Sequence, residues 1–361
     1  MLNQKREFIK LSLLNFFLFF FLKFNLKANE RKRTKVLTNL IFFKHIISPD
    51  HPEKPDRIKY ILNNLKKTKN SSLLEIVETD RDVEKWIREI HFENHIKSLR
   101  NNHSLAEEVS RYAVKVCLTG VDKIMRKESK NIFCAVRPPG HHALNTGKDE
   151  GFCYYNHVAI TAKYIQKKFK LKKILIVDWD YHHGNSTEHF FYNDPTVLFF
   201  STHDQFAYPG TGSPKRKGNG KGLGFNINVH LPCKTKDEQI IKVFDQILVP
   251  KAHKFKPDFI LISAGFDSRI NDTLNPKIKS IIFKTKLNSY SKINQLEEFK
   301  YVFVKPTLQS EKHLASEKST KTENILLNID SNIKNDIINA LLVDIKIKKK
   351  SSINQNFINS F

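Results

Sequence analysis

The stretch "ILIVDWDYHHGN", residues 174–185, joins an apolar run to a cluster of titratable side chains. The four residues 174–177 contain no polar side chain, which predicts a strand that is buried on both faces. Two aspartates and two histidines follow within six residues, at positions 178–183. Buried charged side chains are costly unless they are paired or bind a metal ion. This stretch therefore indicates a functional site.

Similar apolar runs recur along the middle of the chain, separated by segments with helical spacing. The predicted strands, besides the opening one, are 131–136, 196–200 and 258–263. Apolar residues repeat at helical intervals in 158–169 and 240–248. Strands without internal polar residues that alternate with helices predict an α/β fold with a parallel sheet covered on both faces.

Each cluster of polar, site-forming residues follows one of these predicted strands. The residues concerned are His141 and His142, Asp178, Asp180 and His182, Ser201, Thr202 and His203, and Asp267. The carboxyl ends of parallel strands meet at one edge of a sheet, and ligands bind there. We therefore expect these side chains to share a single site.

The residue types within this set favour a metal site. Side chains alternate between faces in extended backbone, so Asp180 and His182 should point the same way, with Asp178 beneath them. Asp267 could complete the set from a neighbouring strand. One histidine and two carboxylates leave a coordination position open, which is typical of catalytic zinc, and Fe(II) tolerates the same ligands. The alternative is a set of buried acids and histidines that pair with one another, at a cost in desolvation.

The adjacent histidines 141 and 142 follow a Pro-Pro-Gly turn and form a second constellation. Histidine titrates near neutral pH, so one beside a metal can act as a general base. Asp178 is a candidate partner for one ring and Asn185 for the other. Because an asparagine brings no charge, its histidine should have the lower pKa.

Several motifs in order resemble those of the histone deacetylase superfamily. They are Arg137-Pro-Pro-Gly-His-His-Ala143, Gly151-Phe-Cys-Tyr-Tyr-Asn156, Asp178-Trp-Asp-Tyr-His-His-Gly-Asn185, Tyr208-Pro-Gly-Thr-Gly212 and Ser263-Ala-Gly-Phe-Asp267, with His51-Pro-Glu-Lys-Pro-Asp-Arg57 and His91-Phe-Glu-Asn-His95 before them. The resemblance covers residues 36–274. Asn185, where an aspartate could stand, resembles the class II and bacterial acetoin-utilisation-like branch. The same asparagine disfavours an arginase-like site with two metals.

This resemblance implies a three-layer α/β/α, arginase-like fold with a mostly parallel sheet. It implies a deacetylase that hydrolyses N-acetyl amides such as acetyl-lysine or an acetylpolyamine. Zinc would polarise the amide carbonyl, held by three ligands: Asp180, His182 and Asp267. The other implied roles are a general base and acid pair, His141 and His142; a substrate tunnel, Gly151, Phe152 and Tyr208; and a monovalent-cation (K⁺) site, Asp178, Ser201 and Thr202.

The resemblance ends near Leu274. The family carries a Glu-Gly-Gly-Tyr motif whose tyrosine donates a hydrogen bond to the developing oxyanion, but no glycine follows Gly265 in this chain. Tyr290 and Tyr301 lack the context of that motif. The loss of one oxyanion donor typically slows catalysis by about 10²–10³. The alternative function is therefore a deacetylase-like protein with impaired catalysis.

The chain divides into three parts by composition. Residues 1–30 combine basic residues with a short apolar run and resemble a signal peptide or a twin-arginine export segment, so an exported, periplasmic protein is slightly favoured over a cytoplasmic one. The same segment could tether the chain to a membrane. Residues 31–274 form the predicted catalytic domain, and 275–361 are a divergent tail rich in Lys, Asn and Ser. A frame disruption and a replaced, working tail both remain explanations for this tail.

The net charge of +24 and the pI near 9.7 do not by themselves identify a partner. The excess of lysine is spread along the chain and forms no arginine-rich stripe with interleaved aromatics, which disfavours nucleic-acid binding. The four cysteines form no C-x-x-C pair. The expected partner is thus an acetylated substrate, and the sequence predicts no oligomeric state.

Overall fold

The computed structural model describes residues 34–67, 69–232, 235–268 and 301–307, the last range as backbone. The signal-like segment 1–30, and with it the prediction of export, lies outside the described residues, as does most of the tail. Within the described ranges, no helix is both long enough and apolar enough to cross a membrane.

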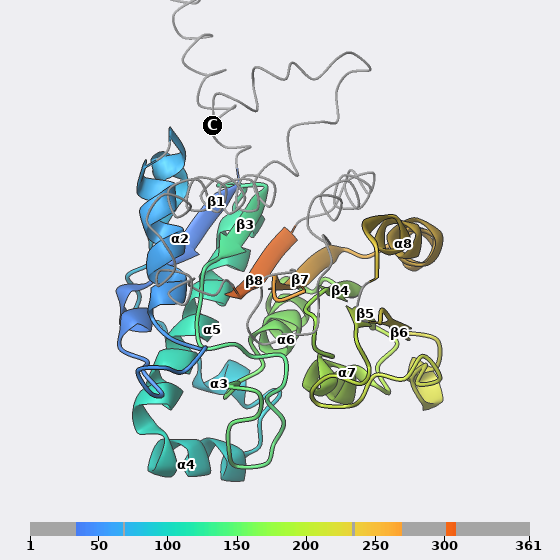
Figure 1. Cartoon of the computed structure of the whole chain (residues 1–361), viewed down its shortest axis with the longest axis horizontal. Helices are drawn as coiled ribbons and strands as arrows, with labels where there is room; N and C mark the ends of the chain where they lie inside the picture. Colours follow the sequence, from blue (N-terminus) through green and yellow to red (C-terminus); the bar gives the residue numbers. More distant parts are fainter. Residues whose placement is uncertain (1–33, 68, 233–234, 269–300, 308–361) are drawn as a thin grey trace, which may run out of the picture.

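An eight-stranded parallel sheet forms the centre of the described structure (Figure 1). Its order is β2-β1-β3-β8-β7-β4-β5-β6. The strands are β1 (Lys35–Thr38), β2 (Leu74–Ile76), β3 (Asn131–Cys134), β4 (Ile174–Asp178), β5 (Val197–His203), β6 (Asn226–His230), β7 (Phe259–Gly265) and β8 (Tyr301–Thr307). Every residue of β3, β4, β5 and β7 is buried, which explains their unbroken apolar runs.

The strand β8 comes from beyond Leu274, the predicted end of the catalytic domain, and lies inside the sheet. It pairs with β3 on one side, with Val302 opposite Ile132, and with β7 on the other, with Val302 opposite Leu261. Part of the segment that the sequence indicated as a divergent tail is therefore an interior strand.

Helices surround this sheet. They are α2 (Asp56–Lys67), α3 (Glu84–Ile87), α4 (Glu93–Asn102), α5 (Ser104–Met125), α6 (His157–Phe169), α7 (Asn185–Phe191), α8 (Asp237–Val243) and α9 (Val249–Phe255). Shorter turns are η1 (Leu40–Phe43), η2 (Lys69–Leu73), η3 (Gly220–Gly222) and the π-helical η4 (Phe244–Leu248), which joins α8 to α9.

The neighbours Phe199 and Phe200 of β5 reveal helical layers on opposite faces, because adjacent side chains in a strand point to opposite sides. The ring of Phe200 lies 5.6 Å from that of Phe244 in η4. The ring of Phe199 lies 6.3 Å from that of His183, just before α7. The predicted α/β fold with helices on both faces of a parallel sheet is confirmed.

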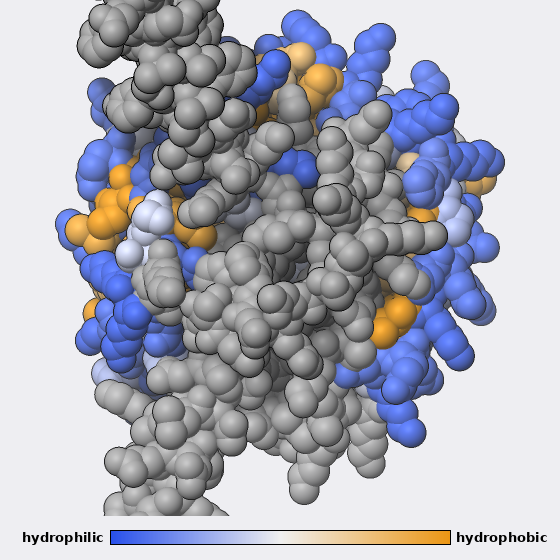
Figure 2. All heavy atoms as spheres, turned by 90° about the horizontal axis from the view of Figure 1, so that it is seen from above, coloured by the Kyte–Doolittle hydropathy of each residue, from blue (hydrophilic) through white to orange (hydrophobic). Residues whose placement is uncertain are grey.

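The described side chains visible on the face in Figure 2 are largely hydrophilic, and the apolar ones among them form small, separate patches. This distribution fits the even spread of lysine along the sequence.

Candidate active site

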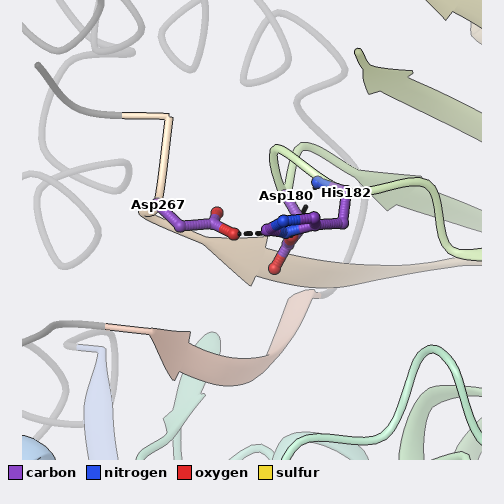
Figure 3. A group of neighbouring side chains, drawn as sticks. All are labelled: Asp180, His182 and Asp267. Atoms are coloured by element: carbon purple, nitrogen blue, oxygen red, sulfur yellow. Dashed lines mark hydrogen bonds and ion pairs between the residues drawn. The ribbon is translucent and has the colours of Figure 1, made fainter. Parts of the chain in front are cut away.

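Asp180, His182 and Asp267 converge at the carboxyl-terminal edge of the sheet, where β4 and β7 are neighbours (Figure 3). His182 Nδ1 lies 2.8 Å from Asp267 Oδ2 and 3.2 Å from Asp180 Oδ1. One donor atom from each residue lies within 4.8 Å of the others. Both carboxylates are 1% exposed. In the part of the chain that the structure describes, no other group of acids, histidines or cysteines could hold a metal ion.

These side chains converge through bends and not through the extended backbone that the sequence suggested. β4 ends at Asp178, whose Oδ1 accepts the backbone N–H of Asp180 at 3.1 Å. Asp180 Oδ1 in turn accepts the N–H of His182 at 2.9 Å. Each carboxylate thus closes a turn two residues ahead of itself. The N–H of Tyr181 donates to Asp267 Oδ1 at 3.1 Å and ties this turn to the end of β7.

Two glycines allow the backbone to approach these carboxylates. A Cβ atom at Gly265 would lie 2.1 Å from Asp180 Oδ2, and one at Gly184 would lie 2.3 Å from Asp178 Oδ2. Neither distance is sterically allowed, so both positions need glycine because of close contact.

The electrostatics of the cluster suit a cation between the two acids. Burial by itself would lower the pKa of His182, but hydrogen bonds and charge from Asp180 and Asp267 outweigh it and raise the pKa to about 10. A proton on His182 therefore offsets the two buried carboxylates. A divalent cation would do so more fully, and a donor set of two carboxylate oxygens and one imidazole nitrogen fits zinc or Fe(II).

The two adjacent histidines lie beside this cluster and have unlike partners. His141 Nδ1 is 2.9 Å from Asp178 Oδ2, and His142 Nδ1 is 2.7 Å from Asn185 Oδ1. The two rings are 4.0 Å apart, and His141 Nε2 lies 3.8 Å from Asp180 Oδ2. Since both partner atoms are acceptors, each Nδ1 carries the proton and each Nε2 is the basic nitrogen.

Tyr208 and Gly151 form a wall over the histidines. The ring of Tyr208 is 5.0 Å from that of His142 and 6.5 Å from that of His182. A Cβ at Gly151 would lie 2.3 Å from His142 Cδ2, so the chain passes directly over the ring. The next residue, Phe152, has a φ of +66° and packs edge-on against His51 at 4.5 Å. The role of these residues in binding substrate stays a prediction.

The residues predicted to bind a monovalent cation are only partly brought together. Asp178 and Ser201 are direct neighbours across β4 and β5. Thr202 is adjacent to Ser201 in β5, so its hydroxyl points to the opposite face of the sheet. The hydroxyl of Ser201 is 2.8 Å from His203 Nδ1. The K⁺ site stays a prediction.

Four residues near the Tyr208 segment had no predicted role: His183, Glu188, Thr211 and Arg216. They are linked by side-chain contacts between α7 and the loop after β5. Glu188 follows Asn185 by about one turn of α7. This spacing is the feature of the sequence that could have placed Glu188 near the site.

A model of the histone deacetylase domain matches residues 51–297 of this chain. Among solved structures, the crystal structure of the HDA15 HD domain superposes with a TM-score of 0.68, covering 87% of this chain and 97% of that one. At 24% identity, that likeness supports the fold alone. It agrees with the α/β arginase/deacetylase-like arrangement.

Curated relatives agree with the domain match. A probable deacetylase of Archaeoglobus fulgidus is 35% identical over 258 residues, which is 66% of this chain and 71% of the relative. Histone deacetylase 6 of Caenorhabditis elegans is 35% identical over 288 residues, 68% of this chain, but the match spans only 30% of that relative's length. The domain match covers more than half of the sequence, and this chain therefore belongs to the histone deacetylase family.

Proposed function

We propose that this chain is a zinc-dependent deacetylase that hydrolyses linear N-acetyl amides, with acetyl-lysine or an acetylpolyamine as substrate. The observation that carries the proposal is the pair of histidines with unlike partners, beside a donor set of two carboxylates and one imidazole. Family membership and the deacetylase relatives support the reaction class.

Asp180, His182 and Asp267 would hold the metal ion. When bound, zinc supplies a Lewis acid that polarises the acetyl carbonyl and offsets negative charge in the transition state. The chain's own contribution to this step is to hold the three donors in a buried turn that Asp178 and Gly265 shape.

The two histidines would divide the proton transfers. Asn185 orients His142 without adding charge, so His142 Nε2 is suited to take a proton from the attacking water. Asp178 favours a positive charge on His141, whose Nε2 also faces Asp180. His141 would then hold a proton close to the reacting amide. The water oxygen would bond to the acetyl carbon, and the C–N bond would then break as the nitrogen takes a proton from histidine, which yields acetate and a protonated amine.

The second candidate is a deacetylase-like protein that binds metal but turns over slowly. The absence of glycine after Gly265, and with it of the tyrosine motif, favours this alternative. A missing oxyanion donor would lower kcat by about 10²–10³.

The decisive experiment combines metal analysis with an acetyl-lysine reporter assay on the purified full-length chain. We expect about one zinc ion per chain and hydrolysis that a chelator abolishes. The His142→Ala variant should lose activity by about 10²–10⁴ and keep its zinc. His189→Ala, an exposed histidine on α7, is the matched control and should behave as wild type.

Zinc bound without turnover of either an acetyl-lysine peptide or an N-acetylpolyamine would favour the second candidate. A chain that binds neither zinc nor Fe(II) would refute both candidates. If the chain is active, comparison of kcat/KM between the peptide and the polyamine identifies the substrate class.

A further inference from the structure

The loop that carries Tyr208 has little regular structure of its own. We define the Tyr208 loop as residues 204–219, between β5 and η3. Gly210, Gly212 and Gly218 within it all have positive φ angles. Glycine-rich irregular backbone loses much entropy when it is ordered, so the position of Tyr208 depends on anchors outside the loop.

Glu188 of α7 is the main anchor from beneath. It is 3% exposed, and its Oε1 accepts a hydrogen bond from Arg216 Nε of the Tyr208 loop at 2.5 Å. Its Oε2 accepts hydrogen bonds from the side chains of Asn226 at 2.8 Å and Asn228 at 2.5 Å, both in β6. Burial raises the pKa of Glu188, but His183 and these donors outweigh it and lower the pKa to about 2, so the anchor is charged at neutral pH.

A second chain of side-chain contacts runs from Glu188 through His183 to the Tyr208 loop. His183 Nε2 lies 3.5 Å from Glu188 Oε2, and its Nδ1 lies 2.7 Å from the hydroxyl of Thr211. Thr211 is three residues from Tyr208. His183 is 1% exposed and Glu188 is 3% exposed, so this path is buried until it reaches the exposed Thr211.

A third contact fixes the loop next to Thr211. His203 Nε2 donates to the carbonyl oxygen of Gly212 at 2.9 Å, while its Nδ1 accepts from Ser201. A Cβ at Gly212 would lie 2.1 Å from His203 Nε2 and 2.7 Å from His183 Cδ2. The backbone at Gly212 therefore rests directly on the two histidine rings.

The front of the loop has an independent anchor. Asp204 Oδ2 accepts the hydroxyl of Tyr181 at 3.0 Å, and its Oδ1 accepts the N–H of Phe206 at 3.0 Å. Glu188 therefore acts on the part of the loop after Tyr208, and Asp204 acts on the part before it.

We propose that Glu188 is a positioning residue for the substrate tunnel, which acts through Arg216 and through His183 and Thr211 to hold Tyr208 over His142. This inference rests on the proposed function, because Tyr208 matters only if substrate passes beside it. The side-chain partners of Glu188 include no metal ligand and neither catalytic histidine; they are Arg216, Asn226, Asn228 and His183.

The proposal predicts a specific kinetic effect. Under the proposed function, Tyr208 would contact the part of the substrate that does not react. A more mobile Tyr208 would therefore weaken binding of the substrate and of the transition state equally. Such a loss raises KM and leaves kcat nearly unchanged. A role in folding alone would instead lower the amount of active protein without changing KM.

The test measures hydrogen–deuterium exchange and steady-state kinetics on the zinc-loaded full-length chain. Glu188→Gln keeps the shape and removes the charge, and Glu188→Ala removes both. Because hydrogen bonds to charged groups are strong, we expect exchange in residues 208–217 to rise about tenfold or more in Glu188→Gln, and further in Glu188→Ala. KM should rise at least about threefold, with zinc content unchanged.

Two further variants keep the test valid if Glu188→Ala fails to fold. Thr211→Val preserves shape but removes the hydroxyl that contacts His183. Arg216→Ala removes the half-exposed guanidinium group that pairs with Glu188. Both should speed exchange in 208–217. Asp194→Asn is the matched control, because the side chain of this acid binds Lys163 and Thr196, which lie outside the Tyr208 loop. It should change neither exchange nor KM.

Unchanged exchange in 208–217 for both Glu188→Gln and Thr211→Val would overturn the proposal. So would an equal rise in β5 and β7, which would indicate general destabilisation. If the wild-type chain hydrolyses no acetyl amide, the proposed function fails, while loop exchange still decides whether Glu188 positions the loop.

Discussion

At the scale of single residues, Asp178 shows how densely the site is built. One of its oxygens closes the turn to Asp180, and the other accepts a hydrogen bond from His141. The same oxygen would lie only 2.3 Å from a Cβ at Gly184. This carboxylate therefore connects the metal-ligand turn to the histidine pair. Its close contact with the backbone at Gly184 leaves no room for a side chain there.

Gly265 gives a direct test of that packing. Gly265→Ala would place a Cβ 2.1 Å from Asp180 Oδ2 and would displace that carboxylate. We expect zinc content to fall well below that of the wild type, measured after dialysis against a fixed concentration of zinc.

Gly220→Ala is the control for Gly265→Ala. Its φ is +52°, but a Cβ there meets no atom within 4 Å. It should cost about 1 kcal/mol of stability and keep its zinc. Equal zinc in both variants would show that the turn tolerates a side chain at Gly265.

At the scale of elements, a buried ion cluster joins Arg137 to the N-terminal region that contains η1 and α2. Glu53, which is fully buried, accepts hydrogen bonds from Arg57 of α2 at 3.2 Å and from Arg137 Nη2 at 2.7 Å. Arg137 also donates to the carbonyl oxygen of Phe42 in η1. Burial raises the pKa of Glu53, but the two arginines outweigh it and lower the pKa. The turn that begins at Arg137 leads to His141, so this cluster supports the histidine pair.

Removal of one partner from this cluster should be costly. Glu53→Ala leaves two buried guanidinium groups without their carboxylate, and we expect a loss of about 3–5 kcal/mol in the free energy of unfolding. Urea denaturation measures this loss. The control is Glu93→Ala, whose partly exposed carboxylate pairs with Arg88 and should contribute no more than about 1 kcal/mol. A similar small effect in both would contradict a structural role for the cluster.

At the scale of the whole molecule, β8 connects two halves of the sheet. β3, which leads to the histidine pair, belongs to the half β2-β1-β3, and the metal ligands follow β4 and β7 in the other half. β3 and β7 are not neighbours in the sheet, because β8 pairs with both. Without β8, each half would expose an unpaired edge in the middle of the fold.

Truncation tests this connection. A chain that ends at Ser268 lacks β8, and we expect it to aggregate or to lose cooperative unfolding. A chain that ends at Thr307 keeps all of the described strands. We expect this longer chain to unfold cooperatively, as followed by circular dichroism during thermal denaturation. Equal behaviour of the two truncated chains would show that β8 is dispensable.

The strands of the active-site edge were predictable because their burial is complete. Residues 174–177 have no polar side chain, so the sequence itself distinguishes a doubly covered strand from a surface strand. β8 was not assigned to the sheet although residues 301–304 are apolar and strand-like, because the resemblance to the family ends near Leu274. Its place between β3 and β7 depends on pairing across more than a hundred residues, which no local pattern records.

The residue types of the site, and the edge of the sheet where they gather, follow from the amino-acid sequence alone. Metal-ligand chemistry is a property of side chains, and the carboxyl ends of parallel strands share one edge. Only the tertiary structure decided how these side chains converge. The bends at Asp178 and Asp180 replace extended backbone, and Glu188 reaches Arg216 from a different element. The physical reason is that hydrogen bonds to buried carboxylates depend on distance and direction in space, which spacing along the chain does not specify.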